Sequence, residues 1–231
     1  MPIIPLLLAE CKRAIHINLK RYLFMMKLSI PNSWQNISID KFPLIFDVIR
    51  DDLEDNEKNI RILSILSDVN VSEIKKINIE GIKKLIDKIQ FVFKMEFPKE
   101  KHKFKHNGFN WVVNYDITKI SAGDFISLSK LTENEDAIIN NLPQIVAVFI
   151  QPFRYKWFRV DAIEMDYTAK VNHLKSVDVG TIYPIAVFFC SIIGSLSIDI
   201  EDYLEKQTQE VKKILMNELN SKSTMNTGDG T

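Results

Sequence analysis

The sequence predicts a mainly α-helical (α+β) fold, a helical bundle-like domain with one small antiparallel β-hairpin around Asn107-Gly108. Three observations support this prediction. Apolar residues recur three and four positions apart through most of the chain, which is the pattern of amphipathic helices. The Asn-Gly pair lies between alternating apolar and polar residues, which is a strong hairpin signal. With 231 residues, 46% of them hydrophobic, the chain can bury one substantial core.

The chain divides into four predicted segments. Residues 1–26 are expected to be an N-terminal extension, with the Met pair at its end as an alternative natural start. Their apolar run of about eight residues is too short to cross a bilayer. Residues 27–198 are expected to form a single α-rich globular domain, followed by a C-terminal amphipathic helix over residues 199–220. Residues 221–231 are predicted to be disordered, because they have no apolar periodicity.

The first part of the domain is predicted to be helical after a short extended start. Pro31 excludes a helix through residues 27–33. Ser38 and Ser72 are each suited to cap the helix that follows them. The expected helices, each with its apolar residues on one face, are residues 39–50, 56–66, 72–77 and 79–93.

Residues 103–112 are predicted to form the hairpin, with Asn107-Gly108 in a type I′ turn that requires positive φ angles. An isolated two-stranded ribbon is only marginally stable in water, so it must pack on helices or gain a third strand. Residues 27–30 are the candidate for that strand.

The second part of the domain is also predicted to be mainly helical. Ser121, with Asp124 three residues later, forms a capping-box-like helix start. Residues 153–160 are aromatic and basic and are expected to be a loop. The expected helices are residues 121–131, 134–140, 142–150, 162–175, 180–197 and 200–220.

The charge balance excludes some binding functions. The chain has 30 basic and 30 acidic residues, and nonspecific duplex binding needs a basic excess to displace counterions. The aromatic and basic segment 153–160 has side chains that can stack on single-stranded bases, but packing on a helix or a protein interface is the commoner use of such residues. Specific binding of a nucleic acid is therefore not expected. Two cysteines do not make a disulfide framework, so a reducing compartment is predicted.

No residue pattern indicates catalysis or metal binding. Cys190 lies in the most apolar run of the chain, where a thiol acts as a small hydrophobic group. His102 and His106 have the spacing of a helical metal pair, but they fall where the hairpin is predicted. The chain contains neither a Gly-x-Ser-x-Gly motif nor a P-loop. The expectation is a non-enzymatic protein with no catalytic residue, cofactor or metal.

The uncharged stretch at residues 179–198 has about the length of a membrane-spanning helix. Pro184, Gly194 and several hydroxyl residues reduce its hydropathy, and no Lys or Arg flanks it directly to orient a span. A core helix explains the same residues and is the favoured interpretation. A membrane-associated protein is the alternative.

An ordered set of short motifs resembles a known group of proteins. It begins with Ile30-Pro31-x-Ser33-Trp34-x-x-Ile37-Ser38 directly before a predicted helix, and it continues with Asn141-Leu142-Pro143-Gln144-Ile145 and Tyr183-Pro184-Ile185-Ala186. The set resembles small proteins of tailed phages and prophages of Bacteroides-like bacteria, which are similar to tail assembly chaperones or to minor virion components. The similarity covers about residues 27–196, and its motifs are structural.

The resemblance implies a non-enzymatic protein of the host cytoplasm that binds apolar helical segments of a tape measure protein. A minor structural or connector protein of the virion is the alternative that the same resemblance allows. Helix-in-groove recognition needs aromatic anchors, although no family binding residue maps onto this chain. The candidate partner-binding residues are Trp34, Phe42, Phe46, Phe153, Tyr155, Trp157 and Phe158. For Trp34, packing in the core is the favoured alternative.

Overall fold

The computed structural model describes residues 28–156 and 159–225, and these confirm the predicted mainly α-helical fold with a small antiparallel sheet. Three short 3-10 helices are η1 (Trp34–Asn36), η2 (Ile39–Lys41) and η3 (Ile117–Lys119). The α-helices are α2 (Phe42–Arg50), α3 (Asp55–Ser67), α4 (Val71–Ile74), α5 (Ile79–Lys94), α6 (Ala122–Leu131), α7 (Glu135–Asn140), α8 (Leu142–Phe149), α9 (Tyr167–Leu174) and α10 (Val179–Met225).

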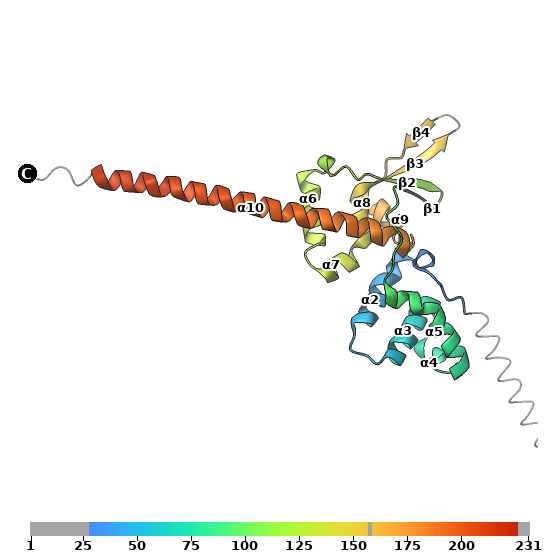
Figure 1. The fold of residues 1–231 in the computed structure, drawn as a ribbon. Helices are drawn as coiled ribbons and strands as arrows, with labels where there is room; N and C mark the ends of the chain where they lie inside the picture. Colours follow the sequence, from blue (N-terminus) through green and yellow to red (C-terminus); the bar gives the residue numbers. More distant parts are fainter. Residues whose placement is uncertain (1–27, 157–158, 226–231) are drawn as a thin grey trace, which may run out of the picture.

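The first part of α10 lies between α2–α5 on one side and the sheet on the other (Figure 1). It packs on α8, α6 and η1. Ile182, Ile185 and Phe189 of α10 are fully buried, and the ring of Phe189 stacks on that of Phe149 at a centroid distance of 3.5 Å. The core therefore forms along one face of α10.

Side-chain caps set several helix starts. Ser121 caps α6 as predicted, with its hydroxyl oxygen accepting a hydrogen bond from the Asp124 amide at 3.1 Å. The predicted cap at Ser72 is wrong, because Asn70 caps α4 and accepts from the Ser72 amide. The predicted cap at Ser38 is also wrong, because Ser38 makes no side-chain cap bond to η2. The α-helix expected from residue 39 begins at Phe42.

The sheet has four antiparallel strands in the order β1 (Lys103–His106), β2 (Phe109–Val113), β3 (Ile150–Lys156) and β4 (Arg159–Ala162). The predicted hairpin is β1–β2. The third strand is β3, which occupies the open edge of β2. The predicted strand at residues 27–30 is wrong over residues 28–30, and Lys27 lies outside the described residues. The predicted loop at residues 153–160 is also wrong over its described residues, because residues 153–156 belong to β3 and residues 159–160 belong to β4. Aromatic and β-branched side chains in this segment suit strands.

The C-terminal part of the chain is more helical than the sequence predicts. The two helices expected at residues 180–197 and 200–220 are one continuous helix, α10, with Pro184 inside it. This helix also includes residues 221–225, where disorder was predicted. The expected helix at residues 162–175 is shorter, because Asp166 caps α9 at Tyr167. Residues 1–27 and 226–231, the predicted extension and most of the predicted tail, lie outside the described residues.

We expect Gly108→Ala to lower the free energy of unfolding by about 1 kcal/mol, because Gly108 has a φ of +78° that an L-residue rarely adopts. Urea denaturation measures the change. Gly194→Ala is the matched control: it lies exposed within α10, and an added Cβ meets no atom within 4 Å. The control is expected to raise stability by about 0.5–1 kcal/mol. Equal effects of the two substitutions would contradict the prediction.

Candidate functional site

A histidine and a serine meet where the hairpin contacts the turn between α9 and α10. His106 Nε2 lies 2.8 Å from Ser176 Oγ, and the Ser176 hydroxyl donates to the His173 carbonyl oxygen at 3.1 Å. A hydrolytic pair needs a group that orients the base and donors for an oxyanion. Among the described residues, no carboxylate is hydrogen-bonded to His106. The pair connects the hairpin to the turn between α9 and α10.

The burial of His106 is expected to make the stability of the fold sensitive to acid. Burial lowers the pKa of His106 below its usual value of 6.5, and His173 lowers the pKa further, while Asp178 opposes the shift. Folded His106 therefore binds its proton at lower pH than unfolded His106. The free energy of unfolding should fall as the pH drops below about 6.5. We expect His106→Gln to reduce this loss in urea titrations at neutral and mildly acidic pH, and equal pH slopes would contradict the assignment.

Cys190 is poorly suited to act as a nucleophile. Burial raises the pKa of its thiol to about 11, so little thiolate is present near neutral pH. Among the described residues, no group of three or more His, Cys, Asp or Glu side chains is placed to hold a metal ion.

Three of the predicted partner-binding residues lie in an aromatic cluster in the core. The ring of Trp34 makes edge contacts with the rings of Phe42 and Phe91, at centroid distances of 5.5 Å and 5.4 Å. Trp34 and Phe42 are 2% and 0% exposed, and Phe46 is half-buried. Trp34 and Phe42 cannot contact a partner in this conformation, so their predicted partner-binding role is corrected to core packing.

The predicted aromatic residues of segment 153–160 lie apart from this cluster. Phe153 is half-buried in β3, paired with Asn110 of β2 and Ala162 of β4. Figure 1 shows β3 and α2 in different groups of elements. The Tyr155 side chain and the whole of Trp157 and Phe158 lie outside the description that the structure gives. Among the described residues, Phe153 therefore does not share a surface with Trp34 and Phe42, which are buried in the aromatic cluster.

The apolar first part of α10 is long enough and apolar enough to cross a membrane. The segment Val179–Ile198 has a mean hydropathy of 1.9, and 44% of its most apolar window is buried inside the protein. Membrane insertion would remove the buried face of this segment from its contacts with α8. The residues of that face are Val179, Ile182, Ile185, Ala186, Phe189 and Ile193.

Beyond Ile198, α10 extends alone, away from the other described elements (Figure 1). We call residues 198–225 the projecting segment. Its residues 205–209 are all exposed, and five consecutive residues span more than one helical turn. Solvent therefore surrounds the helix at this point. The sequence indicated an amphipathic helix here, but it did not indicate that this helix continues the core helix without a break.

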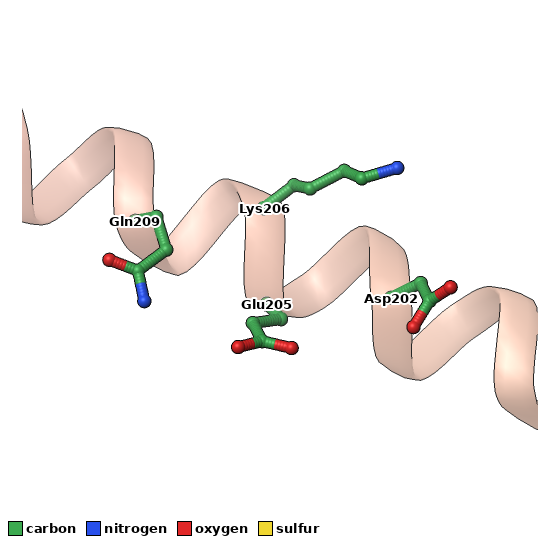
Figure 2. Close-up of a pocket in the computed structure, with 4 residues that line it drawn as sticks. All are labelled: Asp202, Glu205, Lys206 and Gln209. Atoms are coloured by element: carbon green, nitrogen blue, oxygen red, sulfur yellow. The ribbon is translucent and has the colours of Figure 1, made fainter.

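A shallow hollow lies on the projecting segment, lined by Asp202, Glu205, Lys206 and Gln209. Figure 2 shows that all four side chains come from one helix, with Lys206 extending away from the other three. No second element encloses the hollow, so it has no walls to hold a small ligand. The exposed helix, and not this hollow, is therefore the candidate surface of the projecting segment.

Apolar residues recur at helical spacing along the projecting segment. Positions four, seven or eleven residues apart lie near one face of an α-helix. We call this set the apolar stripe. It consists of Ile200, Leu204, Val211, Leu215 and Leu219.

Comparison of the chain with protein-family models, with curated proteins and with solved structures finds no match.

Proposed function

We propose that this protein is a non-enzymatic phage tail assembly chaperone that binds apolar helical segments of a tape measure protein through the projecting segment of α10. The observation that carries the proposal is the exposure of this helix on all sides at residues 205–209, beside an apolar stripe at helical spacing. The resemblance of residues 27–196 to tail proteins supports the choice of partner.

Helix pairing explains why such a segment suits this function. A single helix in water gains little stability from propensity alone and is stabilised mainly by packing its apolar face. A tape measure segment with its own apolar face can supply that packing as a second helix. The chaperone would then keep the apolar face of the tape measure segment out of water until assembly.

The position of the segment also suits a reversible partner. The core lies along Val179–Ile193 of α10, whereas the projecting segment begins at Ile198. We call the described residues within 28–197 the body. A partner on the projecting segment can therefore bind and leave without disturbing the body. This separation matches a chaperone that leaves the tail after assembly.

The test is co-expression of the full tagged chain with helical segments of the tape measure protein from the same phage. We expect the two to co-purify, and we expect Leu204→Glu combined with Leu215→Glu to abolish co-purification. These positions are eleven residues apart and lie on one face of α10. Leu44→Glu is the control, because Leu44 is an exposed leucine of α2, 54% accessible, away from the projecting segment.

Two results would overturn the proposal. One is co-purification that survives the double substitution in the stripe. The other is the protein in purified phage particles at the stoichiometry of a tail component, which would favour a connector protein. Tryptophan fluorescence checks that each variant is folded, because Trp34 and Trp111 are buried in the body.

A further inference from the structure

We infer that, without tape measure protein, a second copy of this chain covers the apolar stripe, with the two projecting segments paired side by side in antiparallel orientation. The inference rests on the proposed function in one respect, because both assign the stripe as a binding face. The inference also states what covers this face in the free protein and how the two helices are oriented.

The charges of the projecting segment favour an antiparallel arrangement. Residues 199–210 contain five acidic residues and one Lys, whereas residues 211–225 contain three Lys and one Glu. Antiparallel pairing places the acidic half of one copy beside the basic half of the other. Parallel pairing places each half beside its own like charges, which is unfavourable.

Four of the five positions of the apolar stripe are symmetric in the way that this pairing requires, and the exception is Val211, which falls opposite Thr208. A two-fold axis between residues 209 and 210 sets Ile200 of one copy opposite Leu219 of the other. The same axis sets Leu204 opposite Leu215. Each apolar position at one end of the stripe therefore meets an apolar position of the second copy.

The stripe also continues the face that α10 buries in the body. Ile182, Ala186, Phe189 and Ile193 are buried and follow steps of four, three and four residues along this face. Seven residues after Ile193, the stripe begins on the same face. The body covers this face up to Ile193, and a second copy would cover its continuation.

The length of the stripe is sufficient for a two-stranded pair. Residues 200–219 of a helix extend about 30 Å, close to three heptads of a coiled coil. In this arrangement the two bodies lie at opposite ends of the paired helices.

Sedimentation equilibrium of the full chain alone tests the inference, and we expect a dimer at micromolar concentration. Glu205 and Lys212 are exposed, lie seven residues apart and share one flank of the stripe. In the antiparallel register Glu205 of one copy lies within a turn of Lys212 of the other. We expect Glu205→Lys to weaken the dimer about tenfold, because it replaces two symmetric attractions with repulsions. Adding Lys212→Glu should restore the dimer.

Lys206→Glu is the matched control, because Lys206 lies on the helix face opposite the stripe and should have little effect. A monomer at all concentrations overturns the inference, as does a Glu205→Lys dimer tighter than the original, which would indicate parallel pairing. Failure of the double substitution to restore the dimer also overturns it. If the protein is a dimer but does not bind tape measure segments, the proposed function is refuted and this inference stands. If the protein is a monomer that binds them, this inference is refuted and the proposed function stands.

Discussion

Replacing Phe42 with alanine is expected to lower the free energy of unfolding by about 3–5 kcal/mol. Phe42 is fully buried in α2, and its ring lies 5.5 Å from that of Trp34 and 5.0 Å from that of Tyr183 in α10. Alanine would remove the central ring between η1 and α10 and leave a cavity. Because a domain of this kind is stable by only about 5–15 kcal/mol, the loss is a large fraction of the total. Urea denaturation followed by tryptophan fluorescence measures it.

Leu44→Ala is the control for this prediction. Leu44 lies on the same helix two residues later and is 54% exposed, so its removal should change stability by about 0.5 kcal/mol or less. A loss below about 1 kcal/mol for Phe42→Ala would show that the aromatic cluster does not hold α2 to the rest of the core. The result also bears on binding experiments, because a variant at Phe42 that loses a partner would report unfolding and not a lost contact.

The helical part of the fold was predictable because its signals are local. Apolar spacing and capping residues predicted a helix near α2, α3, α5, α6 and α8. The errors arose where two local signals competed. Ser72 and Asn70 are both good caps, and the structure uses Asn70, whose side chain accepts from the Ser72 amide.

The sheet was only half predictable. The β1–β2 hairpin has a local turn signal at Asn107-Gly108, but β3 pairs with β2 across about forty residues of sequence. Val113 and Ile150 are aligned in this pairing, and no turn residue marks it. The strand character of residues 150–156 therefore depends on the open edge of β2, which the sequence alone does not reveal.

The candidate site was missed for a related reason. Aromatic residues such as Trp34 and Phe42 suit both a core and an interface, and only the fold shows that they are buried. The projecting segment has ordinary leucines and charges, and its exposure depends on where the body ends. The available signal was the absence of Gly and Pro from residues 195–225, which allows one helix to continue out of the core.

Replacing Gln207 with proline is expected to break the projecting segment while leaving the body folded. Proline within a helix costs about 3 kcal/mol or more, because it removes a backbone donor and clashes with the preceding turn. Gln207 is exposed within the run of residues 205–209, where solvent surrounds the helix. We therefore expect less helical signal in far-UV circular dichroism and loss of tape measure binding. The unfolding of the body, followed by tryptophan fluorescence, should shift by no more than about 0.5 kcal/mol.

Gln207→Ala provides the comparison, because alanine favours the helix and changes the same side chain. It should keep the helical signal and the binding. Ala186→Pro tests the other part of the same helix: Ala186 is fully buried in the body, so proline there should unfold the body as well. If Gln207→Pro destabilised the body as strongly as Ala186→Pro, α10 would behave as one cooperative unit with the core. The projecting segment would then be part of the body's stability and could not serve as a surface that a partner occupies and leaves.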